Sequence, residues 1–157
     1  RQVVKLDPTD FDATFRLGIT CNNLKMPAKA LIYFNKLLSR DKNNVDVLIN
    51  KGYSLHLMGK YGRAILCYKQ VLKQDPDEIN AIYYMSKSTA RQNDAKQTCE
   101  LISKLLKLQF INDLDHDHDH DHNHNHKQVH LIEKIQKDSD FKRMRTNANF
   151  LFLLKHN

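Results

Sequence analysis

The stretch VDVLINKGYSLHLMGKYGRAILCYKQVLKQDPDE, residues 45–78, decides the fold of this chain. Its apolar spacing predicts two helices, with a break between them at Gly59. Pro76 ends the second helix, because proline has no amide N–H and restricts the residue before it. Gly52 and Ala64 are small, which lets two antiparallel helices approach each other closely. The stretch therefore predicts one complete helix–turn–helix unit.

The same pattern recurs on both sides of this unit, with a period of about 34 residues. Residues 11–44 match it with a proline at the start of the second helix and with the residues Leu17, Gly18, Pro27, Ala30, Phe34 and Leu37. Residues 79–112 match it more weakly, because Ser86 replaces the glycine, Thr98 replaces the alanine and no proline closes the unit. Three units in phase predict an array of stacked helix pairs, since one unit alone cannot bury its apolar face.

The framework positions of residues 45–78 resemble those of a tetratricopeptide repeat (TPR). The residues that carry this resemblance are Leu48, Gly52, Leu55, Gly59, Tyr61, Ala64, Tyr68, Val71 and Pro76. The resemblance implies an all-α fold, a right-handed superhelical solenoid of antiparallel helix pairs. It also implies a non-catalytic scaffold that holds other proteins together within a larger intracellular assembly.

The two ends of the chain depart from the regular repeat. Residues 1–10 resemble the end of a second helix, so we expect a truncated upstream repeat there and a chain that is a fragment. Residues 113–126, DLDHDHDHDHNHNH, form a low-complexity His/Asp/Asn-rich insertion. Residues 127–157 predict a helical capping unit that covers the end of the core, with Asp138 or Ser139 and then Asn147 as helix caps. The apolar run 150–154 is expected to be buried there or on a partner.

Composition narrows the class of protein. The 157 residues carry a formal net charge of +7, which we interpret as a lysine-rich solvated surface. No apolar run approaches the length of about 20 residues needed to span a bilayer. The three cysteines are few and widely spaced, which indicates a reducing, cytoplasmic compartment without disulfides: Cys21, Cys67 and Cys99. The glycines are scattered over the repeat framework, and no nucleophile–base grouping can be argued from spacing. We therefore expect no enzyme, no catalytic residue and no cofactor.

The histidine tract is the one candidate for a metal site. Its histidines alternate with Asp and Asn at His116, His118, His120, His122, His124 and His126. Neutral imidazoles bind zinc-type ions, but structural zinc sites use a defined set of four ligands, whereas these are interchangeable. We therefore assign no metal site and favour a hydrated loop. The aspartates of the tract leave open a mild pH-sensitive charge switch.

In the TPR family the first helix of each repeat lines the inner surface of the array. The resemblance places an apolar strip with a more basic end on that surface, formed by Phe15, Ile19, Ile49, Asn50, Tyr53, Leu57, Tyr83, Lys87 and Arg91. Such a strip suits an amphipathic helix or an extended segment, supplied by a partner protein or by this same chain. The clamp with which TPR co-chaperones grip carboxylates is not expected. Only Asn50 matches it, and its other positions hold Phe15, Ile19, Asn80 and Tyr84.

Two other functional classes stay open beside the scaffold. One is a metal- or pH-responsive binding protein that works through the histidine-rich tract. The other is a basic, nucleic-acid-associated TPR module, because residues from Lys127 onward carry an excess of Lys and Arg. The aromatic residues there suit a packed helix face better than a base-stacking platform, so nucleic acid is not the expected partner. Family members also occur in ciliary complexes, and the sequence does not select among such settings.

Overall fold

The second helices of the three repeats begin at the same point of each unit. The computed structural model describes residues 8–115 and 125–156. The second helices start 34 residues apart, and they are α2 (Pro27–Leu38), α4 (Tyr61–Gln74) and α6 (Ala95–Asp115). They follow the first helices α1 (Pro8–Asn23), α3 (Val45–Leu57) and α5 (Ile79–Arg91). The regular elements of the described residues are all helices, which confirms the predicted all-α fold.

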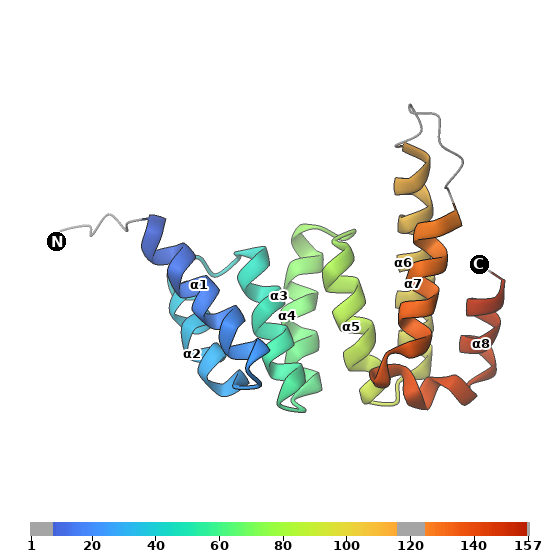
Figure 1. Cartoon of the computed structure of the whole chain (residues 1–157), viewed down its shortest axis with the longest axis horizontal. Helices are drawn as coiled ribbons and strands as arrows, with labels where there is room; N and C mark the ends of the chain where they lie inside the picture. Colours follow the sequence, from blue (N-terminus) through green and yellow to red (C-terminus); the bar gives the residue numbers. More distant parts are fainter. Residues whose placement is uncertain (1–7, 116–124, 157) are drawn as a thin grey trace. The chain divides into compact units, whose positions relative to one another are not determined.

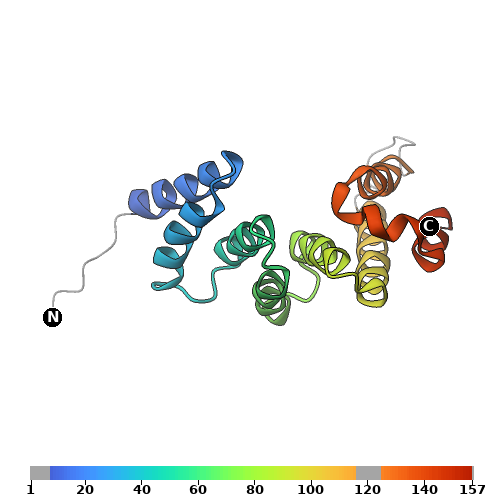
Figure 2. The same cartoon turned by 90° about the horizontal axis from the view of Figure 1, so that it is seen from below.

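The chain divides into two compact units, Arg1–Pro76 and Asp77–Asn157. The first contains two antiparallel helix pairs, α1/α2 and α3/α4 (Figure 1). The second contains α5 and α6, followed by α7 (Asn125–Lys137), the 3-10 helix η1 (Ser139–Thr146) and α8 (Ala148–Lys155). In both views α7 runs alongside α6, and η1 contacts α5 and α8 (Figure 2). The third predicted repeat therefore belongs to the same compact unit as the C-terminal helices.

Each first helix ends in a left-handed residue at the same repeat position. These residues are Lys25 (φ 58°), Gly59 (φ 73°) and Asn93 (φ 64°). At each turn, the N–H of the following residue bonds back to a carbonyl near the helix end, with Met26, Lys60 and Asp94 as donors at 2.8–3.0 Å. This is the hydrogen-bond pattern of a Schellman cap, which favours glycine. Of this set, only the glycine was identified from the sequence.

Lys25 is expected to be the strained member of that set, because a Cβ disfavours the left-handed region. Replacing Lys25 with Gly should raise the free energy of unfolding of the first unit by about 1 kcal/mol. Gly59→Ala should lower it by a similar amount, since its φ is positive while nothing lies within 4 Å of an added Cβ. Urea titrations would measure both changes, and a loss of stability in Lys25→Gly would contradict the strain argument.

Close contact between the helices of each pair in the first unit depends on a glycine. A Cβ on Gly18 would lie 2.5 Å from Phe34 Cε1, and a Cβ on Gly52 would lie 2.5 Å from Tyr68 Cε1. Phe34 and Tyr68 are fully buried. The small residue of the first helix therefore faces the aromatic residue of the second helix in both repeats.

The C-terminal segment contributes buried apolar side chains to the second unit. Buried apolar side chains there are Ile135, Phe141, Met144, Phe150 and Leu154. Asp138 caps η1 and Asn147 caps α8, each accepting a backbone N–H, as predicted. The apolar run 150–154 is only partly buried, because Leu151 is 40% exposed and Phe152 is 65% exposed. One face of a short helix cannot bury five consecutive side chains.

Two predictions lie outside the described residues. The upstream repeat predicted at residues 1–10 falls largely on residues 1–7, and most of the histidine-rich tract falls on residues 116–124. In the described parts of the chain, no helix combines the length and the apolar character that crossing a membrane requires.

Candidate functional site

The first helices of the first unit carry most of the predicted interaction strip. Phe15 and Ile19 lie on α1, where both are half-buried and pack on the core formed by Ala30, Phe34, Leu37 and Val47. Asn50, Tyr53 and Leu57 lie on α3 and are also half-buried. We call these five residues, Phe15, Ile19, Asn50, Tyr53 and Leu57, the α1/α3 face.

Ile49 belongs to the predicted strip but is only 7% exposed. Its side chain contributes to the core rather than to a surface that a ligand reaches. The hydrophobic pattern of α3 does not distinguish it from its neighbours, because Ile49, Tyr53 and Leu57 all have apolar side chains spaced four residues apart.

A buried polar link joins α1 to α3 behind this face. Ser54 Oγ donates to Asn22 Oδ1 at 2.9 Å, and Asn22 Nδ2 donates to the carbonyl oxygen of Asn50 at 3.4 Å. Asn22 and Ser54 are buried, so these bonds satisfy polar groups that would otherwise be costly to desolvate. The link fixes the register of the two first helices. Reasoning from the sequence missed Ser54, although a serine within an apolar helix pattern was a usable signal.

The predicted strip residues of α5 contact the C-terminal segment of the same chain. Lys87 Nζ lies 2.9 Å from Asp138 Oδ2 and 3.1 Å from Asp140 Oδ2. Tyr83 Oη donates to Asp138 Oδ2 at 3.0 Å, and Arg91 Nε lies 3.8 Å from Asp140 Oδ1. The side chains of Lys87, Asp138 and Asp140 are each 15% exposed. The predicted strip residues of α5 therefore contact a later segment of this same chain.

Burial and charge shift the pKa values of this cluster. Burial lowers the pKa of Lys87, but hydrogen bonds and ion pairs with Asp138 and Asp140 outweigh that effect and raise it overall. Burial raises the pKa of Tyr83 strongly, and the charge of Asp138 and its hydrogen bond raise it further. The phenol therefore stays neutral at physiological pH and acts as a hydrogen-bond donor to the carboxylate.

The described cysteines and histidines form no reactive grouping. Burial raises the pKa of the Cys67 and Cys99 thiols, which lowers the fraction of nucleophilic thiolate. Within residues 8–115 and 125–156, no cluster of three or more His, Cys, Asp or Glu side chains could hold a metal ion. Most of the histidine-rich tract lies outside those ranges, so the absence of a metal site there stays a prediction.

Comparison with known proteins identifies the repeats. Models of the tetratricopeptide repeat match residues 11–44 and residues 45–78, which together form the helix pairs α1/α2 and α3/α4. The chain carries tetratricopeptide repeats. The boundaries of both matches coincide with those of the first two repeats inferred from the sequence. The TPR is a protein-interaction module, and its repeats support a scaffold role for this chain.

Solved structures of another protein, MamA, resemble the fold. MamA from Desulfovibrio magneticus RS-1, solved from its residue 41 to the end, superimposes with a TM-score of 0.57 at 17% identity, covering 92% of this chain and 93% of that one. A double mutant of MamA RS-1 gives a TM-score of 0.57 at 16% identity, covering 92% and 94%. At this identity the similarity concerns the fold alone. No curated protein matches the chain.

Proposed function

We propose that this chain is a non-catalytic scaffold that binds a segment of a partner protein on the α1/α3 face. The observation that carries the proposal is the α1/α3 face itself, where apolar side chains from two successive first helices remain partly accessible. The link between Asn22 and Ser54 holds those helices in one register. A surface whose helices are already held together before binding loses less conformational entropy when a ligand binds.

An amphipathic helix or an extended segment is the proposed ligand. Phe15, Ile19, Tyr53 and Leu57 offer apolar contacts, and Asn50 provides an amide beside them. Large apolar and aromatic anchors surrounded by polar residues are typical of surfaces that bind an amphipathic helix. The chain would act as a subunit of a larger assembly in a reducing, cytoplasmic setting.

The α5 residues support this proposal less than the α1/α3 face does. Tyr83, Lys87 and Arg91 already contact carboxylates of the C-terminal segment. For the same reason, Lys87 and Arg91 do not favour the alternative of nucleic-acid binding. We therefore restrict the proposed partner surface to the first unit.

The proposal is tested by changing two half-buried residues of the α1/α3 face. Tyr53→Asp combined with Leu57→Asp should weaken partner binding at least a hundredfold, because two carboxylates would have to be desolvated against an apolar ligand. Affinity purification from native extract would supply the partner, and calorimetric titration with the purified partner would measure the affinity.

The matched control places the same charges on the second helices. Ile32 on α2 and Leu66 on α4 are exposed apolar residues, so Ile32→Asp with Leu66→Asp adds the same charge at accessible positions outside the α1/α3 face. This control should bind the partner normally, and circular dichroism should show that both variants stay helical. If Tyr53→Asp with Leu57→Asp leaves partner binding unchanged, the α1/α3 face is not the partner-binding surface.

A further inference from the structure

A pocket in the second unit is a candidate small-molecule site outside the α1/α3 face. Its volume is about 550 Å³, and α5, α6 and α7 each contribute to its wall. The apolar part of the lining is formed by Ile79, Leu105 and Leu131. A cavity of this size with mostly apolar walls and a few polar groups is typical of small-molecule sites.

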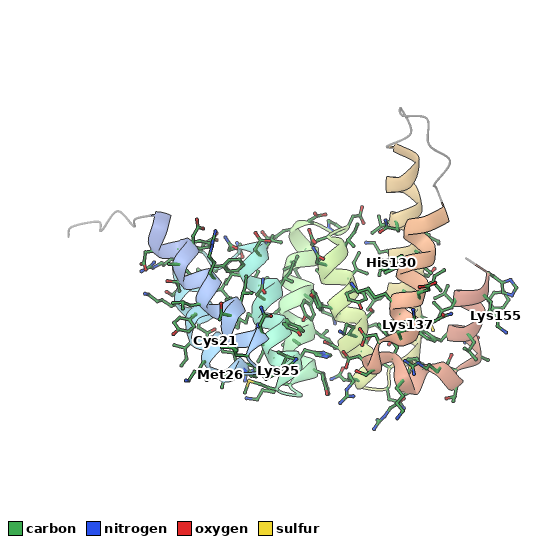
Figure 3. The ribbon with its side chains drawn as sticks, in the orientation of Figure 1. Cys21, Lys25, Met26, His130, Lys137 and Lys155 are labelled. Carbon is green, nitrogen blue, oxygen red and sulfur yellow. The ribbon has the colours of Figure 1, made fainter. Side chains whose placement is uncertain are left out.

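The polar lining of the pocket is basic. The described residues that line it include Lys134 and no carboxylate, and the other lining residues with a polar group are Asn80, Tyr83, Gln109 and His130. Figure 3 labels His130 on α7, one turn before Lys134 in the sequence. An apolar cavity with a single cationic group favours a ligand that has an apolar body and one negative charge.

Lys134 differs from the neighbouring Lys87 in its partners. The ammonium groups of both residues lie near the ring of Tyr83, at 4.6 Å for Lys134 and 5.6 Å for Lys87. Lys87 is neutralised by Asp138 and Asp140. In the part of the chain that the structure describes, Lys134 has no carboxylate within ion-pairing distance. The ring of Tyr83 therefore orients an ammonium group whose charge is available to a ligand.

We infer that the pocket between α5, α6 and α7 binds a small amphiphilic carboxylate. The apolar body of the ligand lies against Ile79, Leu105 and Leu131, and its carboxylate pairs with the ammonium group of Lys134. A charge-assisted hydrogen bond of this kind is stronger than a neutral one and selects acids over alcohols of the same shape. This inference does not depend on the scaffold proposal, because the pocket and the α1/α3 face belong to different units.

Phenylbutyrate is a suitable probe, and phenylbutanol is its neutral analogue. The whole chain is titrated with phenylbutyrate, and the binding is monitored through the amide chemical shifts. The chemical-shift changes should fall on α5, α6 and α7. Phenylbutanol should bind the same residues about tenfold more weakly, because it lacks the charge that pairs with Lys134. Shifts scattered over both units, or equal affinity for the acid and the alcohol, would overturn the inference.

Two lysine variants complete the test. Lys134→Gln should reduce the affinity for phenylbutyrate about tenfold and leave the affinity for phenylbutanol unchanged. Lys137→Gln is the matched control, since Lys137 lies on the same helix, pairs with Glu133 at 3.4 Å and does not line the pocket. The control should bind both probes as the unmodified chain does. No detectable binding of phenylbutyrate up to its solubility limit, or an equal loss in both variants, would contradict the assignment.

Discussion

Gly52→Val is expected to lower the free energy of unfolding of the first unit by about 3 kcal/mol, as overpacking of a dense core does. Even the first added carbon would lie 2.5 Å from Tyr68 Cε1 and 2.7 Å from Tyr68 Cζ. Tyr68 is fully buried, so its ring can move away only by displacing other side chains of the interior. Urea denaturation followed by circular dichroism would measure the loss.

Gly62→Ala provides the control for this prediction. Gly62 is an exposed residue in the first turn of α4, and alanine there should stabilise the helix by up to about 1 kcal/mol.

A second variant tests the cause, because Gly52→Ala combined with Tyr68→Leu should be more stable than Gly52→Ala alone. The third repeat has a related pair at the equivalent positions, Ser86 and Ile102, which are both buried. If removing the ring restores no stability, the contact with Tyr68 is not the reason for glycine.

Lys87→Met is expected to destabilise the second unit by about 3 kcal/mol, the typical cost of breaking a largely buried ion pair by removing one of its members. The substitution leaves Asp138 and Asp140 without the ammonium group that lies 2.9 Å and 3.1 Å from them. Both carboxylates are mostly buried, so water replaces the lost cation poorly. Hydrogen exchange of the α5 and η1 amides would locate the effect, and calorimetry would measure its size.

Lys104→Met is the matched control for this lysine. Lys104 pairs with Asp77 at 2.9 Å, but the two side chains are 42% and 63% exposed. A surface ion pair of this kind contributes at most about 1 kcal/mol.

The triple change Lys87→Met, Asp138→Asn and Asp140→Asn should recover much of the stability, because no buried charge then lacks a partner. Equal effects of the Lys87 and Lys104 variants would show that the cluster is not a buried ion pair.

The pH dependence gives a second readout of the same cluster. The folded-state pKa values of Lys87 and Tyr83 are both raised above their ordinary values. A raised pKa means that the folded state retains its proton at a pH where the unfolded chain releases it. The stabilisation is therefore complete below about pH 10 and is lost as the pH rises further. The Lys87→Met variant should lose less stability above that pH than the unmodified chain does, since only Tyr83 then contributes to the pH dependence.

Local sequence patterns predicted most of the helical framework. Proline and glycine act on the backbone at their own positions, so Pro27, Gly59 and Pro76 could be interpreted without knowing the tertiary structure. The first turns of η1 and α8 were also predictable, because Asp138 and Asn147 cap helices through contacts only two or three residues away. Lys25 was not predictable in this way, since nothing in its side chain favours the left-handed conformation that it adopts.

The interaction strip could be predicted only in part. Repeat periodicity indicated which residues lie on the first helices, and this places Phe15, Ile19, Tyr53 and Leu57 on neighbouring helices. Periodicity does not indicate how deeply each side chain is buried, so Ile49 was grouped with residues that are more accessible. Burial depends on what packs over a helix, and that is a property of the assembled unit.

By itself, the sequence determined the helix pairs, their period and the small residues at which they touch, because these depend on neighbouring residues and on one repeated pattern. Only the tertiary structure showed that Tyr83, Lys87 and Arg91 contact Asp138 and Asp140. Tyr83 and Asp138 are 55 residues apart, and no periodicity links a repeat helix to a segment that follows a low-complexity insertion. The pocket beside Lys134 has the same origin, since its walls come from three helices that meet only when the second unit folds.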